Sequence, residues 1–159
     1  SKRIPGKNIK LFCGKPLIAW TIEEAKKSKH ISRVIVSTDD EAIARVAKKY
    51  GAEILFMRPQ ELAKDLTPDF PVFEHALLWL RENEKLVPDI VAHLRVNVPF
   101  RSAVDIDTGI ELLSKNTSYD SVRAVIPAPL HPLKTYRLQG KKLCAYVPES
   151  VSGFKQPYN

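Results

Sequence analysis

The stretch RVIVSTDDEAIARVAKKYGAEILF, residues 33–56, contains a complete strand, helix and strand pattern. Its first six residues are rich in β-branched side chains, which favour a buried strand. Asp39 and Asp40 can cap the helix that follows, and Gly51 can end it. A second short run, 53–56, completes the unit. Because parallel strands need a crossover of this length, the stretch predicts a βαβ unit.

The same alternation continues on both sides of this unit. The expected helices cover 16–29, 41–50, 69–80 and 103–114, and the expected strands cover 33–38, 53–56, 89–94 and 121–125. This order predicts a largely parallel sheet with helices on both faces. In such sheets ligands bind where loops leave the carboxyl ends of the strands. We therefore expect a site at the loops that follow Thr38, Phe56 and Leu94.

Size and charge limit the possible function classes. The 159 residues, 44% of them hydrophobic, are enough for one domain with a real core. The net charge is +7, but the basic residues are dispersed, which is not typical of a nucleic-acid-binding tail. No apolar run reaches the roughly 18 residues of a membrane span, so we expect a soluble protein. Cys13 and Cys144 lack metal-ligand spacing, and a reducing cytoplasm is expected.

The first nine residues, SKRIPGKNI, place three cations around a Pro-Gly turn. Lys2, Arg3 and Lys7 cannot lie on one plain amphipathic helix, because the turn separates them. A cationic turn suits a small anionic ligand, and a solvated basic arm is the alternative.

Near the other end of the chain the pattern indicates a hairpin. The runs 136–138 and 143–147 are joined across 139–142, which contains a glycine. Such a hairpin serves as a lid over a site or as an arm for a partner subunit.

Five fragments, in this order, resemble one known family: SKRIPGKNIKLFCGKPLIAWTI, VSTDDEAIARVAKKYGAE, RPQELAKD, VPFRSAVDID and HPLKTYRL. They cover almost the whole chain and are similar to the acylneuraminate cytidylyltransferases, or CMP-sialic acid synthetases. The CMP-Kdo synthetases share the opening turn and the general frame. The resemblance implies a three-layer α/β/α, Rossmann-like (GT-A-like) nucleotidyltransferase fold with a mainly parallel sheet. It also implies a nucleotide-binding domain at 1–126, followed at 127–159 by the start of a hairpin, lid or dimerisation segment.

The resemblance further implies that the opening turn binds the phosphates of CTP. Ser1, Lys2, Lys7 and Asn8 are the expected nucleotide-binding residues there. Lysine charges and turn N–H groups are suited to phosphate oxygens. Lys7 is also the expected catalytic residue, because a cation beside the turn can stabilise charge that develops as pyrophosphate leaves.

Further positions match the family less specifically. Arg58 begins the Arg-Pro-x-Glu-Leu-Ala segment and is expected near the cytosine or ribose, with a surface role as the alternative. Asp65 follows the same segment, and a turn-capping role stays open. His131 and Lys134 match the start of the lid region. His75 and His93 are expected to be packing residues.

Two departures from the family concern the loop that it uses for nucleotide and sugar acid and a position close to the base. Where the family usually reads Leu-Gln-Pro-Thr-Ser-Pro-Leu-Arg, this chain reads LRVNVPFR over 94–101. Asp69 stands where the family often has serine, close to the base. Asp69 and Arg95 remain expected near the nucleotide, and Asn97 and Arg101 near the sugar acid. The changes indicate a different nine-carbon α-keto acid or a loss of activity.

The reaction implied is CMP transfer from CTP to the anomeric hydroxyl of a sialic-acid-like sugar, with Mg²⁺ and release of pyrophosphate. No metal ligand is assigned, and a homodimer without nucleic acid or membrane partners is expected. The alternatives are a CMP-Kdo-type or other nucleotide-sugar synthetase and a non-catalytic nucleotide-binding module. A basic nucleic-acid-binding domain is a third, disfavoured because no aromatic cluster accompanies the charge. The family's chains are longer at both ends, so we expect a portion of a longer protein.

Overall fold

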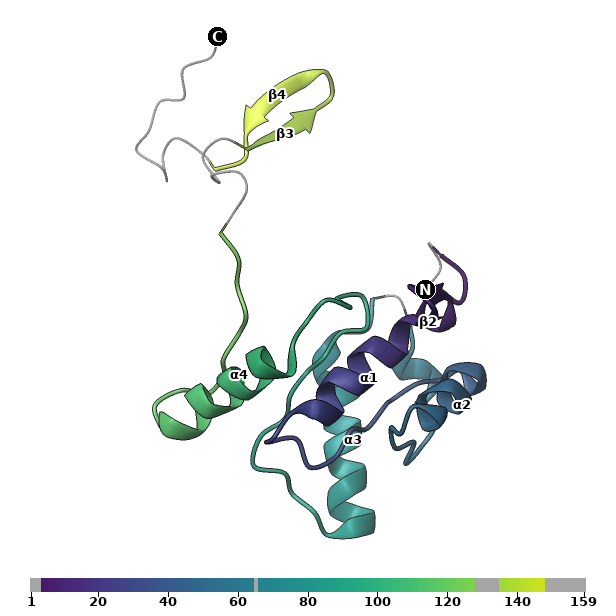
Figure 1. The fold of residues 1–159 in the computed structure, drawn as a ribbon. Coiled ribbons are helices and arrows are strands. Elements are labelled where there is room, and N and C mark those ends of the chain that lie inside the picture. The colour runs from purple at the N-terminus through teal and green to yellow at the C-terminus, as the bar shows by residue number, and fades with distance from the viewer. Residues whose placement is uncertain (1–3, 65, 128–134, 148–159) are drawn as a thin grey trace. The chain divides into compact units, whose positions relative to one another are not determined.

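The computed structural model describes residues 4–64, 66–127 and 135–147. It divides into two compact units, residues 1–122 and 123–159. The first unit contains, in order, η1 (Lys7–Ile9), β1 (Leu11–Phe12), β2 (Lys15–Pro16), α1 (Leu17–Lys27), α2 (Glu41–Lys49), η2 (Gln60–Leu62), α3 (Asp69–Glu84) and α4 (Ala103–Lys115) (Figure 1). All four predicted helices are therefore confirmed, with shifted ends.

The core of the first unit forms around α1. Ile18 and Ile22 are 2% and 1% exposed and pack with Ala47 of α2 and with Ala52. The small alanine side chains let α2 approach α1 closely. Partly buried side chains surround this cluster: Val34, Val36, Ile43, Val46, Tyr50, Ile54 and Val96. The core thus joins both helices to the extended segments that precede the predicted site loops.

The helix ends follow from capping chemistry. The Asp40 carboxylate accepts hydrogen bonds from the backbone N–H groups of Ala42 (2.7 Å) and Ile43 (3.2 Å), which confirms the predicted cap of α2. Gly51 follows α2 with φ of 88°, a conformation that favours glycine. Helix α3 runs four residues beyond its predicted end, because the polar residues after Leu80 still have good helix propensity.

Helix α4 is attached to α1 through polar groups. Ser102 and Asp105 form a capping box at its start. The Asp107 carboxylate accepts hydrogen bonds from the Ser28 hydroxyl and from the Lys29 backbone N–H, the latter at 3.1 Å. The backbone N–H of Ala103 donates to Glu24 at 3.1 Å. These bonds fix α4 against the carboxyl end of α1.

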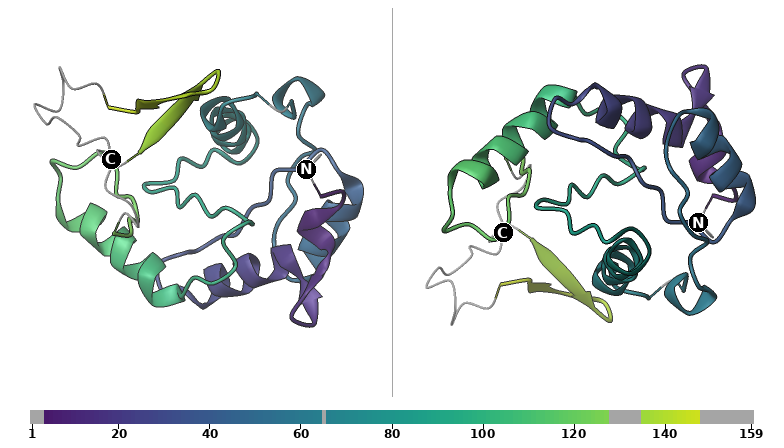
Figure 2. Two further views of the ribbon diagram at one scale, coloured as in Figure 1. Left: turned by 90° about the horizontal axis from the view of Figure 1, so that it is seen from above. Right: turned by 90° about the horizontal axis from the view of Figure 1, so that it is seen from below.

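The predicted parallel sheet is only sparsely formed among the described residues. One parallel bridge joins Ile35 to Glu53, with Val36 N–H donating to Glu53 O at 3.0 Å and Glu53 N–H to Val34 O at 2.7 Å. The predicted strands 33–38 and 53–56 are thus reduced to one bridge between extended segments, which cross between the four helices (Figure 2).

The predicted strands 89–94 and 121–125 are wrong for this structure. Neither segment makes a backbone–backbone hydrogen bond to another described segment, and a strand is defined by such bonds. The segment 89–94 is attached to helix α3 by the edge-to-face contact of His93 with Phe73, whose ring centroids are 4.6 Å apart, while Val91 is 51% exposed.

A short hairpin, β1–β2, was not predicted. Leu11 pairs with Pro16, and Phe12 pairs with Lys15. The turn between them has positive φ at Cys13 (48°) and Gly14 (86°), as a type I′ turn requires. The Cys-Gly dipeptide here takes the place of the usual Asn-Gly, which is why the sequence pattern gave little signal.

The second unit contains the predicted hairpin. Strands β3 (Tyr136–Gln139) and β4 (Lys142–Ala145) are antiparallel, and Gly140 in the turn has φ of 60°. His131 and Lys134 lie outside the described residues, so their predicted roles stay predictions. Within the described parts of both units, every helix is too short or too polar to cross a membrane.

Candidate functional site

The opening turn is compact and contains a partly buried cation, Lys7. The carbonyl of Gly6, which has φ of 62°, accepts hydrogen bonds from the N–H groups of Ile9 (3.0 Å) and Lys10 (3.1 Å). η1 contacts both α1 and α2. Lys7 and Asn8 are partly buried, and among the described residues no carboxylate pairs with the Lys7 ammonium. Ser1 and Lys2 lie outside the described residues.

Arg58 lies where the two bridged segments end, as the topology rule predicted. Its Nε donates to Ser37 Oγ at 3.0 Å, and a second guanidinium N–H donates to the Ser37 carbonyl. Its own backbone N–H donates to Thr38 O at 2.8 Å. Burial lowers the pKa of Arg58, and the nearby Asp39 partly opposes this change. Arg58 therefore ties together the loops that follow Thr38 and Phe56.

The loop 95–101 is folded around its last residue. The Arg101 guanidinium donates to the carbonyl of Val98, at 3.0 Å from Nε and 2.9 Å from Nη2, and also to the carbonyl of Arg95. Burial lowers the pKa of Arg101. Asn97 lies exposed within this loop. Arg101 therefore fixes the conformation of the loop by bonding to backbone carbonyls within it.

Arg95 and Asp69 form an ion pair between this loop and the first residue of α3. Both were predicted near the nucleotide, and the pairing brings them together. Close by, burial lowers the pKa of His93, opposed by Asp69 and reinforced by Arg95 and Arg101. The predicted packing role of His93 fits its contact with Phe73.

Two contacts attach the loop 95–101 to the rest of the first unit, one to β1 and one to the core around α1. The rings of Phe12 in β1 and Phe100 in the loop meet edge to face, with centroids 5.6 Å apart. Val96 packs against the core cluster that contains Ile18 and Ile22. The Phe12–Phe100 contact thus joins the loop 95–101 to the hairpin β1–β2, which directly follows the opening turn in the first unit (Figure 1).

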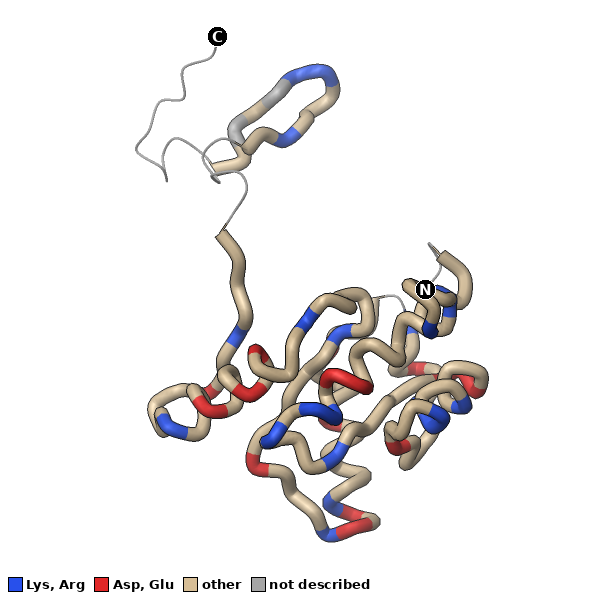
Figure 3. Tube along the Cα trace, viewed as in Figure 1, with Lys and Arg blue, Asp and Glu red and all other residues tan. Residues whose placement is uncertain are grey.

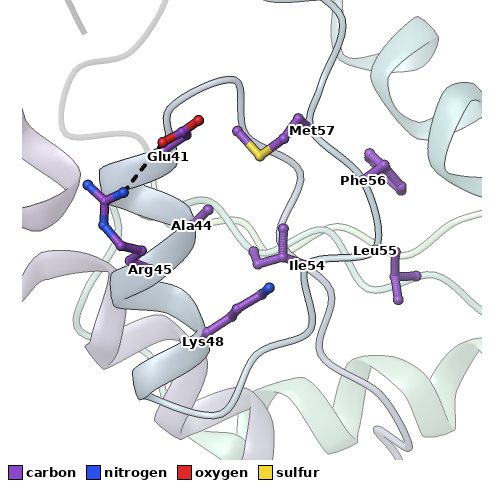
Figure 4. A pocket seen from close by; sticks show the side chains of 8 residues that line it. All are labelled: Glu41, Ala44, Arg45, Lys48, Ile54, Leu55, Phe56 and Met57. Atoms are coloured by element: carbon purple, nitrogen blue, oxygen red, sulfur yellow. Dashed lines mark hydrogen bonds and ion pairs between the residues drawn. The ribbon is translucent and has the colours of Figure 1, made fainter.

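A separate cavity of about 330 Å³ lies between α2 and the segment 54–57 (Figure 4). Ile54 and Met57 face α2 across it, and Arg45 pairs with Glu41 at its edge. None of the predicted site residues lines it. Its wall consists of Glu41, Ala44, Arg45, Lys48, Ile54, Leu55, Phe56 and Met57.

Along the described part of the first unit, basic and acidic positions are interspersed on the Cα trace (Figure 3). Among the described residues, no group of three or more His, Cys, Asp or Glu could hold a metal ion. Mg²⁺ commonly uses only one or two protein carboxylates together with substrate phosphates, so such a group is not required. No metal ligand is assigned.

A family model described as "Cytidylyltransferase" matches residues 1–132. The chain belongs to the cytidylyltransferase family. This confirms the predicted family and its nucleotidyltransferase class.

A CMP-N,N′-diacetyllegionaminic acid synthase of Legionella pneumophila is 39% identical over 132 residues, 83% of this chain and 56% of the relative. An N-acylneuraminate cytidylyltransferase of Escherichia coli is 36% identical over 125 residues, 79% of this chain and 28% of the relative. This cytidylyltransferase chain thus spans about half or less of the length of these relatives.

The fold of the cytidylyltransferase chain is similar to that of a solved CMP-2-keto-3-deoxy-manno-octonic acid synthetase in complex with CTP. The TM-score is 0.61 at 22% identity, over 74% of this chain and 44% of the other. The α/β nucleotidyltransferase-like fold is therefore confirmed. The three-layer parallel arrangement, the division at residue 126, Mg²⁺, the homodimer and the cytoplasmic location stay predictions.

Proposed function

We propose that the protein transfers CMP from CTP to a sialic-acid-like nine-carbon α-keto sugar acid and releases pyrophosphate. The observation that carries the proposal is the opening turn, in which Lys7 is partly buried and lacks a carboxylate partner among the described residues. A partly buried cation without a partner attracts an anion more strongly than a solvated or paired one. Membership of the cytidylyltransferase family makes the triphosphate of CTP the natural anion.

Each part of the described site has a proposed task in this reaction. Lys7 and Asn8 bind the phosphates, and Lys7 stabilises the charge that develops on the leaving pyrophosphate. Arg58 holds the loops after Thr38 and Phe56 together beside the nucleotide through its hydrogen bonds to Ser37 and Thr38. Asn97, exposed on the loop that Arg101 closes, faces the sugar acid in this proposal. Mg²⁺ would neutralise phosphate charge when bound.

The acceptor is proposed from the relatives' names and from the loop sequence. The two relatives are named for a legionaminic acid and for an acylneuraminate, both nine-carbon α-keto acids. The fold is shared with a synthetase for the eight-carbon acid Kdo, so Kdo is the competing acceptor. A homodimer whose arm is the β3–β4 hairpin also belongs to this proposal.

The test is pyrophosphate release with CTP, Mg²⁺ and a panel of sugar acids: N-acetylneuraminate, N,N′-diacetyllegionaminate, pseudaminate and Kdo. We expect release that depends on one nine-carbon acid and falls at least about a hundredfold in Lys7→Ala, because one preorganised charge contributes that much in comparable sites. Lys10→Ala is the matched control, since Lys10 belongs to the same turn but is exposed.

Three results would count against the proposal. Release with Kdo alone would replace the nine-carbon acceptor by the CMP-Kdo-type alternative. CTP binding without release for any acid would favour the non-catalytic nucleotide-binding module. Equal loss in Lys7→Ala and Lys10→Ala would show that net charge, and not the position of Lys7, supports the reaction.

A further inference from the structure

Asp69 and Arg95, the two charged departures that the resemblance places near the nucleotide, form an ion pair with each other. Asp69 begins α3, and Arg95 begins the loop 95–101, 26 residues later. The guanidinium of Arg95 donates to Asp69 Oδ2, and the two side chains are 59% and 53% exposed for Arg95 and Asp69, respectively. The two departures therefore have opposite charges and contact each other.

The backbone around this pair does not depend on it. The loop is closed by Arg101, whose three hydrogen bonds go to the carbonyls of Val98 and Arg95. Val96 is anchored in the core, and Phe100 contacts Phe12. Asp69 occupies the first turn of a helix, where a carboxylate is favourable without any partner. Removal of either charge should thus leave the loop and helix in place.

We propose that Asp69 and Arg95 act as one electrically neutral unit beside the nucleotide, in which the Arg95 guanidinium compensates the charge of the Asp69 carboxylate. The proposal rests on the proposed function, because it places the pair next to a bound nucleotide. The guanidinium is committed to Asp69 and does not serve as a phosphate ligand. This reassigns both residues, which were predicted as separate nucleotide contacts.

The charges explain why Asp69 requires Arg95 beside it, whereas Arg95 does not require Asp69. Without Arg95, the uncompensated carboxylate of Asp69 would lie beside the bound nucleotide and repel its negatively charged phosphates. For a separation on the order of 8 Å in water, repulsion between one carboxylate and doubly charged Mg·CTP lowers affinity about fivefold. Arg95 alone would add attraction and would not weaken binding. The pair contributes little to stability, since exposed ion pairs rarely do.

The test is a double-mutant cycle read as CTP affinity by calorimetry with Mg²⁺ at low ionic strength. The variants are Asp69→Ser, Arg95→Gln and the double variant. We expect Arg95→Gln to weaken binding about fivefold, Asp69→Ser not to weaken it, and the double variant to lie within about twofold of the wild type. The defect of Arg95→Gln should shrink at about 0.5 M salt, where exposed charges are screened. A merely structural role would not depend on salt in this way.

Arg81→Gln is the matched control, because Arg81 is exposed in the last turn of the same helix and lacks a partner among the described residues. It removes the same charge from the protein, and we expect affinity within about twofold of the wild type. Melting temperatures verify folding, and Asp69→Asn replaces Asp69→Ser if the serine variant is unstable.

Each other outcome overturns the inference. If Arg95→Gln weakens binding equally with Asp69 and with Ser at position 69, Arg95 contacts the nucleotide directly and the two residues are not a unit. If neither single variant changes affinity, the pair is an ordinary surface ion pair. If the wild type does not bind CTP, the proposed function fails first and the inference fails with it, which the wild-type titration reveals before any variant is compared.

Discussion

Replacement of Ile22 by alanine should cost the protein several kcal/mol of unfolding free energy. Ile22 is 1% exposed and lies in the cluster with Ile18, Ala47 and Ala52. The change removes three carbon atoms from a fully buried side chain, which at about 0.8 kcal/mol per buried methylene is roughly 2.4 kcal/mol of lost transfer energy. The backbones of α1 and α2 limit collapse around the site, so a cavity penalty brings the total to about 3–4 kcal/mol.

Urea denaturation followed by far-UV circular dichroism measures this cost, because the four helices of the first unit dominate the signal. The control is Ile126→Ala, the same chemical change at a side chain that is 83% exposed, where a change below about 0.5 kcal/mol is expected. A loss below about 1 kcal/mol in Ile22→Ala would refute the assignment of the core to the α1–α2 contact.

Three further predictions follow from local structure. Arg33 lowers the pKa of Glu53 by a hydrogen bond, so this pair's stability contribution is present above the ordinary Glu pKa of 4.5 and is lost as pH falls through the lowered value. The difference in melting temperature between wild type and Arg33→Met should therefore shrink below pH 4.5, and a difference that is constant with pH would contradict this. Asp40→Ala should cost about 1 kcal/mol in urea denaturation, because two N–H groups lose their cap, and Asp39→Ala, one residue away, should cost clearly less. Gly51→Ala should lower the melting temperature because its φ of 88° is strained for alanine and the new Cβ meets the Lys26 side chain; an unchanged melting temperature would show that the chain after α2 relaxes freely.

The helices could be predicted because their signals are local. Asp40 lies next to the N–H groups that it caps, and the buried positions of α1 recur within eleven residues. The end of α3 was not predicted because the residues after Leu80 continue the helix through their helix propensity, without the apolar repeat that marks a helix in the sequence.

The strands were predicted less well because a strand needs a partner. The run 89–94 has four apolar residues and the run 33–38 has three, yet among the described residues only the run 33–38 finds a backbone partner, at Glu53. Tertiary packing decides which extended segments pair with each other, and the residue pattern of a single segment carries no information about its partner. The ion pair of Asp69 and Arg95 also could not be predicted from local sequence. The sequence singles out each residue separately, and only the fold brings the two side chains together across 26 positions.

The type I′ turn of β1–β2 places one of the chain's two cysteines at the tip of a hairpin. Cys13 is free and exposed, and its neighbour Phe12 contacts Phe100 in the loop 95–101. A spin label attached at position 13, in a Cys144→Ser background, would therefore sit one residue from the contact that joins the opening segment to this loop. The line shape of its paramagnetic resonance spectrum would then respond when ligands order or loosen that contact, so the native sequence already supplies a site for a spectroscopic reporter.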